Sequence, residues 1–199
     1  MTYGTDQPRG LVPVMYKTGA PYTGMVREYP IADAYATAIY TGDPVISLAD
    51  GTIGIGVAGS VCRGVFMGVK YQGTDGIWYH RPYWPASTDT MGTSTARALI
   101  ADDPNLVFSI QETNASGDAG TALALADRGL NANFVIAAGS TTTGITGSSL
   151  NNASELTTST LNLKIMDLDP YPGNVVGSFA NWLVCWNTHE LMGVGTTGV

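Results

Sequence analysis

Short segments of alternating apolar residues, separated by turn sequences, constrain the fold of this chain more than any other feature. From residue 36 onward, apolar side chains recur at every second position, as in Ile-Gly-Ile-Gly-Val at 53–57. This period is typical of β-strands, whose successive side chains point to opposite faces. Turn sequences such as Asp50-Gly51 and Gly73-Thr74-Asp75-Gly76 separate the segments. We therefore expect an all-β fold, an antiparallel β-barrel or sandwich.

Two parts of the β-rich region do not follow this pattern. Residues 119–130 are rich in Ala and Leu and are compatible with a short helix ending at Gly129. Residues 139–160 are almost all Ser, Thr, Gly and Asn, which predicts a long polar loop with a display or contact role. The strands that we expect are at 53–57, 61–71, 77–80, 96–101, 106–112, 133–138, 161–168 and 181–188.

The first 35 residues differ from the rest because Gly or Pro interrupts them every few positions. We predict that 1–35 form an extended N-terminal arm and that 36–199 form the barrel or sandwich domain. Ordering a backbone costs about 1–2 kcal/mol per residue, so the apolar side chains of the arm must bury against its own barrel or a neighbouring subunit. The predicted partner-binding residues are Val12, Val14, Tyr16, Tyr22, Tyr29 and Tyr35.

Composition limits the partners that the chain can bind. Only 13% of its 199 residues are charged, the net charge is −7, and three residues are lysine, so no basic stripe is available for phosphates. No stretch approaches 18 uninterrupted apolar residues, and the start lacks a signal-peptide pattern. We expect a protein made in the cytoplasm that binds neither nucleic acid nor membrane. Cys62 and Cys185 are expected to be buried thiols.

Several patterns resemble catalytic or cofactor sites, but each has a simpler structural explanation. The sequence at 54–59 matches G-x-G-x-x-G, yet the following residues favour a strand over the helix that a dinucleotide site requires. Asp102 and Asp103 precede Pro-Asn, which is typical of a turn, and adjacent strand residues point to opposite faces. Asp167 and Asp169 share a face, and we interpret them as a strand end before a loop.

The two histidines have no sequence partners that would make a catalytic or metal site. His80 lies between Tyr79 and Arg81, and His189 follows Cys185 by four residues. Nucleophile or zinc chemistry would need a third ligand or an orienting carboxylate. We therefore predict a protein that is not an enzyme, with no catalytic, cofactor-binding or metal-binding residues.

The tryptophans indicate packing. Trp182, Val184 and Trp186 share one face of the predicted strand at 181–188, and apolar residues also lie on the other face, so this strand is expected to be covered on both sides. The aromatic run at 78–85 fits either a plug at the edge of the core or a platform that binds carbohydrate.

Segments along nearly the whole chain together resemble a family of small virion structural proteins of tailed phages, often encoded beside the major capsid protein. The matching segments are GLVPV (10–14), GAPYTG (19–24), TGDPV (41–45), DGTI (50–53), GVFMGVKY (64–71), YWPA (83–86), DDPNLVF (102–108) and GSTTTG (139–144).

This resemblance implies a capsid cement, or decoration, protein on the outer surface of the head, where it would stabilise the capsid lattice. Its partners would be the major capsid protein and neighbouring copies of itself, in a homo-oligomer such as a trimer. The resemblance implies no catalytic residue. The alternative function is a tail or fibre module that binds a host glycan or receptor through Trp78, Tyr79, Tyr83 and Trp84.

Overall fold

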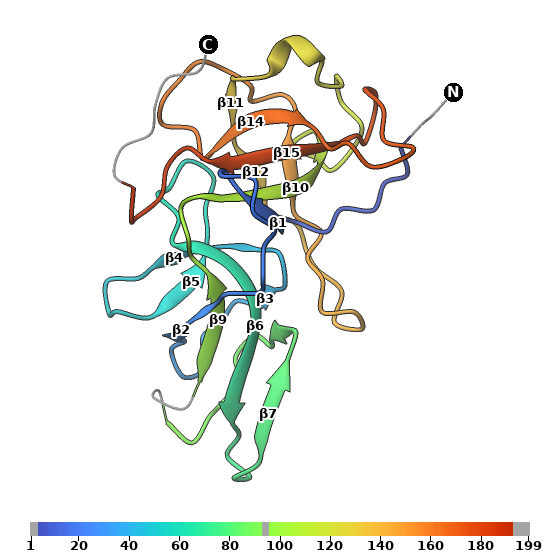
Figure 1. Ribbon diagram of the computed structural model, residues 1–199. Coiled ribbons are helices and arrows are strands. Elements are labelled where there is room, and N and C mark those ends of the chain that lie inside the picture. The colour runs from blue at the N-terminus through green and yellow to red at the C-terminus, as the bar shows by residue number, and fades with distance from the viewer. Residues whose placement is uncertain (1–3, 93–95, 193–199) are drawn as a thin grey trace.

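The computed structural model describes residues 4–92 and 96–192. Within these residues the regular secondary structure is almost all β, with a seven-stranded sheet, a six-stranded sheet and a two-stranded ladder. Figure 1 shows the first of these at the top of the molecule and the second below it, so we call them the upper and lower sheets. The predicted all-β fold is confirmed.

Each segment that was predicted as a strand overlaps an observed strand. The upper sheet consists of β1 (Val12–Tyr16), β10 (Leu106–Thr113), β11 (Asn131–Ala132), β12 (Phe134–Val135), β13 (Ser149–Asn151), β14 (Leu163–Leu168) and β15 (Asn181–Trp186). The lower sheet consists of β2 (Arg27–Pro30), β4 (Pro44–Ser47), β5 (Ile53–Ile55), β6 (Gly64–Gln72), β7 (Trp78–Arg81) and β9 (Arg97–Ala101). The ladder pairs β3 (Ile39–Tyr40) with β8 (Tyr83–Trp84).

The upper sheet nearly closes into a barrel. Its strand order is β11-β14-β15-β10-β13-β12, with β1 also paired to β10. The first and last strands in this order are separated along the chain by Asn133, so both edges of the sheet belong to one short segment. The neighbouring strands are antiparallel except for β10 and β13, which run parallel. Near-closure leaves little open sheet edge for unwanted pairing.

Buried apolar side chains of the described residues form two main clusters. The upper core lies inside the upper sheet and includes Phe108, Trp182 and Trp186. The lower core lies against the lower sheet and includes Phe66 and Trp84. Burial of the apolar surface of these aromatic residues and of the aliphatic residues around them stabilises each cluster.

Strand β6 lies between the two cores. Val65 belongs to the upper core and its neighbour Phe66 to the lower core, because adjacent side chains point to opposite faces. The register with β9 shifts between Phe66 and Gly68, and Gly68 has a φ of 149°. This bulge allows Val69 to face the lower core again farther along the strand.

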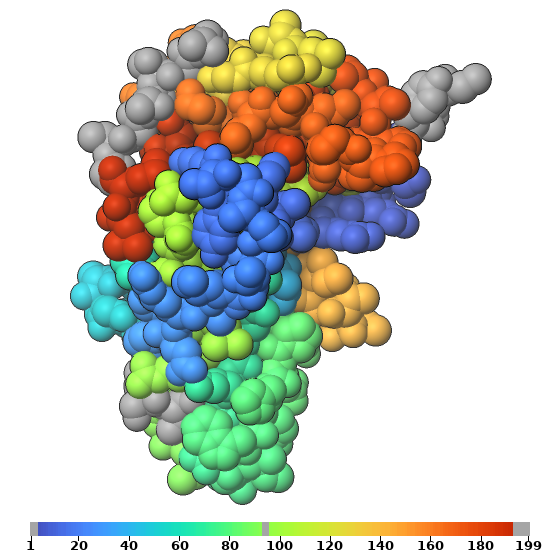
Figure 2. All heavy atoms as spheres, in the orientation of Figure 1, coloured from blue at the N-terminus to red at the C-terminus, as the bar shows by residue number. Residues whose placement is uncertain are grey.

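The N-terminal segment packs on the rest of the same molecule. Leu11 is buried in the upper core and Ile31 in the lower core. Strand β1 pairs with β10, and β2 pairs with β9. Figure 2 shows this segment, in blue, crossing the front of the molecule from the upper part to the lower part. The segment is extended, and it connects the upper lobe, which is the upper sheet with its core, to the lower lobe, which is the lower sheet with its core.

The Ala- and Leu-rich segment at 119–130 forms a short 3₁₀ turn, Leu125–Asp127, and otherwise irregular backbone. The backbone N–H of Leu123 donates to the buried Glu112 carboxylate at 2.8 Å, a tertiary contact that holds this segment in a non-helical path. The composition of residues 119–130 is compatible with a short helix, but the structure shows only the 3₁₀ turn there.

The polar segment at 139–160 is partly interior. It contains β13, and Ser148, Ser149 and Leu150 are buried there. The hydroxyls of Ser149 and Thr113 are 2.5 Å apart, so a side-chain hydrogen bond compensates the burial of these polar groups. Display or contact therefore cannot be the role of the whole segment.

Candidate functional site

Asp102 is the centre of an ionic network where the two sheets meet. Its carboxylate accepts hydrogen bonds from the Arg27 guanidinium at 3.1 Å and the Tyr29 hydroxyl at 2.5 Å. Arg63 lies 3.9 Å from the same carboxylate and donates to the Tyr29 hydroxyl at 2.6 Å. Asp103 instead accepts from the backbone N–H of Asn105 at 2.8 Å, as expected for a turn. The two carboxylates therefore hold separate structural contacts and do not converge.

Glu190 joins the C-terminal part of the described chain to the same junction. Its carboxylate accepts from the backbone N–H and the hydroxyl of Ser47 at 2.8 and 2.7 Å, and lies 3.4 Å from Arg63. The neighbouring His189 is buried, burial lowers its pKa, and its Nδ1 accepts from the backbone N–H of Leu191 at 3.1 Å. Burial also raises the pKa of the Cys62 thiol to about 12, which makes it a poor nucleophile at neutral pH.

Two further carboxylates are buried away from this network. Asp43 accepts from the hydroxyls of Thr146 and Ser148 at 2.5 and 2.8 Å, which ties the polar segment to the lower sheet. Burial raises the pKa of Asp43. Burial also raises the pKa of Glu112, in β10, to about 7. Sequence reasoning identified neither group, because nothing in the local sequence shows that these positions are interior.

The remaining predicted chemical patterns also have structural roles. The G-x-G-x-x-G segment begins in β5 and continues into a turn with no helix at 54–63, as its sequence context predicted. Asp167 pairs with Arg128 at 3.0 Å, and Asp169 accepts from the Ser109 hydroxyl. These two carboxylates thus have different partners. Among the described residues, no group of three or more His, Cys, Asp or Glu side chains is placed to hold a metal ion.

The six predicted partner-binding residues have different environments. Val12 and Val14 on β1 are 42% and 40% exposed. Tyr16 and Tyr22 pack against the upper core, with ring centroids 6.4 Å apart. The other two residues pack against the lower core, where the hydroxyl of Tyr29 joins the Asp102 network and the hydroxyl of Tyr35 accepts from the backbone N–H of Ile55 at 3.0 Å. Of the six, the two valines present the most accessible apolar surface.

The aromatic run at 78–85 is divided between the core and the surface. Trp84 is fully buried and contacts Tyr71 edge-on, with ring centroids 5.5 Å apart. Tyr79 stacks on Tyr71 at 5.3 Å, while Trp78 is 54% exposed. Trp84 therefore acts as the core plug that the sequence suggested, and it is not available to a glycan platform.

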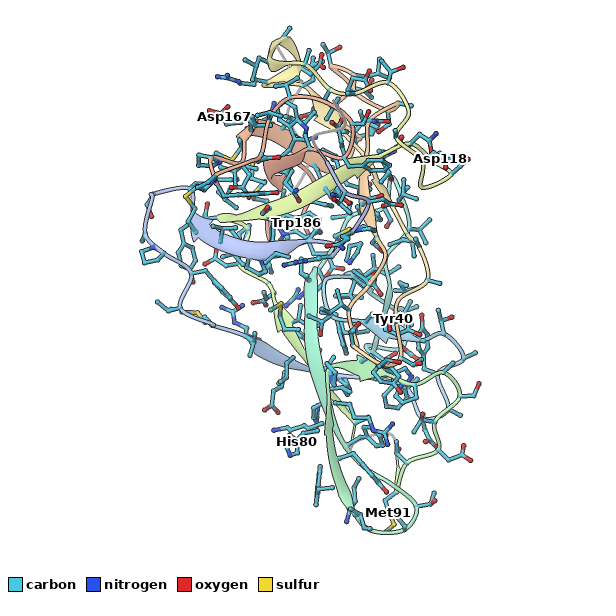
Figure 3. All side chains as sticks on the ribbon, turned by 90° about the vertical axis from the view of Figure 1, so that its right-hand side faces the viewer. Tyr40, His80, Met91, Asp118, Asp167 and Trp186 are labelled. Atoms are coloured by element: carbon cyan, nitrogen blue, oxygen red, sulfur yellow. The ribbon has the colours of Figure 1, made fainter. Side chains whose placement is uncertain are left out.

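Trp78 belongs to an uncovered region that we call the lower sheet face, formed by the outward side chains of Lys70, Gln72, Trp78, His80 and Arg97. Register places Gln72 opposite Trp78, and Lys70 opposite both His80 and Arg97. The backbone N–H of Met91 donates to the carbonyl of Gln72 at 3.0 Å, and Met91 is 56% exposed. Figure 3 shows His80 pointing away from the body and Met91 at the lower end of the molecule.

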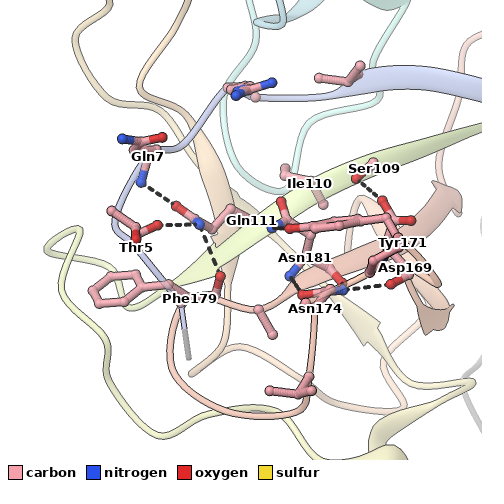
Figure 4. A pocket seen from close by; sticks show the side chains of 18 residues that line it. Thr5, Gln7, Ser109, Ile110, Gln111, Asp169, Tyr171, Asn174, Phe179 and Asn181 are labelled. Atoms are coloured by element: carbon pink, nitrogen blue, oxygen red, sulfur yellow. Dashed lines mark hydrogen bonds between the residues drawn. The ribbon is translucent and has the colours of Figure 1, made fainter. Parts of the chain in front are cut away.

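A pocket of about 540 Å³ lies on the outer side of the upper sheet. Its floor includes Ser109 and Gln111, and its walls are the N-terminal segment at 4–12 and the loop at 169–181. Figure 4 shows the side-chain amide of Gln111 joining Gln7, Thr5 and Phe179 on one side of this pocket. No sequence signal identified it, because its three parts lie far apart along the chain.

Comparison with protein-family models, curated proteins and solved structures finds no match to this chain. In the described part of the chain, no helix has the length and apolar character needed to cross a membrane.

Proposed function

We propose that this chain is a non-enzymatic structural protein whose lower sheet face binds other protein subunits, and that it serves as a cement protein on the outer surface of a tailed-phage head. The observation that carries the proposal is an uncovered sheet face on which the Trp78 side chain is more than half exposed. Tryptophan is strongly enriched among residues that dominate binding energy at protein interfaces. The resemblance to phage virion proteins gives the proposed location.

The polar part of the lower sheet face is also suited to burial against protein. Lys70 pairs with Glu28 within the same sheet, so its charge has a partner when water is removed. Gln72 donates to the carbonyl of Gly76 at 2.9 Å. With these partners, the side chains of Lys70 and Gln72 lose less free energy on desolvation than isolated polar groups would.

The ionisable groups that chemistry would require are engaged elsewhere. Asp102 and Glu190 hold the junction of the two sheets, and Asp43 holds the polar segment. These contacts support a structural role for the three carboxylates. A second contact with a neighbouring copy or with the major capsid protein is proposed for Val12 and Val14, which are exposed on β1.

A cement protein repeats its contacts over many copies, so each contact needs only modest affinity. Binding across neighbouring capsid subunits would then resist their separation collectively. A homo-oligomer such as a trimer is the proposed bound form, since the capsid lattice offers symmetric positions.

The test is sedimentation of purified chain with DNA-filled heads that lack it, followed by quantification of bound protein. Trp78→Ala should bind about 30-fold more weakly, because a central interface tryptophan contributes about 2 kcal/mol or more. Tyr171→Ala, which removes an exposed aromatic from the upper lobe, is the matched control and should bind as the parent does.

Two results would contradict the proposal. Full head occupancy by Trp78→Ala would exclude the lower sheet face as the contact. Mass spectrometry of separated particles that finds the chain in tails alone would instead favour a tail or fibre module.

A further inference from the structure

We propose that the pocket on the outer side of the upper sheet binds a neutral saccharide. The site is distinct from the lower sheet face and from the aromatic run at 78–85. It is formed by β10, the N-terminal segment and the loop at 169–181. Its volume of about 540 Å³ suits a ligand of two or three sugar rings.

The charge of the pocket favours a neutral ligand. Arg9 and Asp169 both line it, so one positive and one negative side chain balance each other. Its other polar side chains are hydroxyls and amides, such as Ser109, Gln111 and Asn181. These groups match the hydroxyls of a sugar, which both donate and accept hydrogen bonds. An anionic ligand would be opposed by the Asp169 carboxylate, which lines the pocket.

The polar wall is held in place before any ligand binds. The side-chain amide of Asn174 donates to the carbonyls of Asp169 and Asn181 at 2.7 Å each, and its oxygen accepts from the backbone N–H of Asn181 at 3.0 Å. The Ser109 hydroxyl donates to one carboxylate oxygen of Asp169. Such preorganisation reduces the entropy lost on binding.

Tyr171 supplies an aromatic surface at this wall. Its hydroxyl accepts from the side-chain amide of Asn181 at 2.7 Å, which restrains the ring, while the residue remains 46% exposed. The C–H groups of a sugar ring pack favourably against an aromatic face. A restrained, accessible ring beside carboxylate and amide groups can therefore contact both the apolar face and the hydroxyls of one sugar.

A peptide is a less suitable ligand because the floor strand offers no continuous free edge. One edge of β10 pairs with β15, and the other pairs with β1 at Ser109 and with β13 at Glu112. Between those two pairings, the side chain of Gln111 bonds the backbone of Gln7, Thr5 and Phe179. Strand addition, which peptides commonly use, would have to break these contacts.

Saturation-transfer NMR with maltotriose, N-acetylchitotriose and mannotriose at millimolar concentration tests the proposal on the full chain. At least one of the three should receive saturation from the protein. Tyr171→Ala should weaken its binding about tenfold, since an aromatic contact contributes up to about 1.5 kcal/mol. Tyr171→Phe keeps the ring and should retain most of the affinity, which separates stacking from a change in folding.

Trp78→Ala, on the other lobe, is the matched control and should bind the sugar as the parent does. The proposal is overturned if none of the three saccharides receives saturation, or if Tyr171→Ala binds with unchanged affinity. Loss of binding in Trp78→Ala alone would place a glycan site on the aromatic run instead. Head binding by Tyr171→Ala is measured separately, so this inference and the cement function can fail independently.

Discussion

The upper and lower lobes differ in how many faces of their sheets they bury. In the upper sheet, Trp182 and Trp186 on β15 face the upper core, while Leu183 and Cys185 on the opposite face pack with Met15 in a small third cluster. In the lower sheet, β7 alternates exposed and half-buried residues. We therefore expect substitutions in the upper lobe to reduce stability, and substitutions on the lower sheet face to reduce binding.

The largest effect is expected from Trp182→Ala. The side chain is fully buried in the upper core, so its removal should lower the free energy of unfolding by about 3–5 kcal/mol. Trp78→Ala, at an exposed position, should change it by no more than about 0.5 kcal/mol. Urea unfolding followed by circular dichroism measures both. Equal losses would show that the lower sheet face is as important to the fold as the upper core.

The pH dependence of stability should also come from the upper lobe. The pKa of Glu112 is raised from 4.5 to about 7 in the folded protein, so the folded state holds this proton more tightly than the unfolded state. The stabilisation is complete below pH 4.5 and is lost as pH rises to about 7, a loss of roughly 3 kcal/mol.

Glu112→Gln should remove this part of the pH dependence, which urea midpoints across that window measure. Asp118→Asn, at an exposed loop position, is the matched control and should keep the parent profile. A profile of Glu112→Gln that still falls between pH 4.5 and 7 would assign the dependence to another group.

A smaller effect is expected at the junction of the lobes. Asp102→Asn removes a buried charge that Arg27, Arg63 and Tyr29 contact, and should cost about 1.5–3 kcal/mol. Arg27→Ala should cost less, about 0–1 kcal/mol, because the Arg27 side chain is 62% exposed. A double-mutant cycle by urea unfolding measures the coupling. Equal costs for the two substitutions would contradict the central position of Asp102.

The sequence was most informative where local pattern and turn chemistry agree. The Asp50-Gly51 turn between β4 and β5, and the turn at 73–76 between β6 and β7, were both predicted, and Gly51 and Gly76 adopt the positive φ values that such turns need. Burial of both faces of β15 followed from its unbroken apolar run and is confirmed.

The conformation of segments that depend on contacts with distant residues could not be predicted from the local sequence. β13 was hidden in a polar segment because hydrogen bonding, rather than hydrophobicity, stabilises its buried Ser149. The segment at 119–130 has helix-favouring residues, but a contact from Glu112 holds it in another conformation. The helix propensity of these residues is a weak local preference, and tertiary contacts override it.

The sequence by itself determined the class of fold, most of the strands and the scarcity of charge, since each follows from neighbouring residues and side-chain chemistry. The tertiary structure alone decided which carboxylates are buried, that the N-terminal segment packs on its own chain, and where the pocket and the lower sheet face lie. The physical reason is that these features arise from contacts between residues far apart along the chain. A period-two pattern predicts which face of a strand a side chain is on, but it does not predict what covers that face.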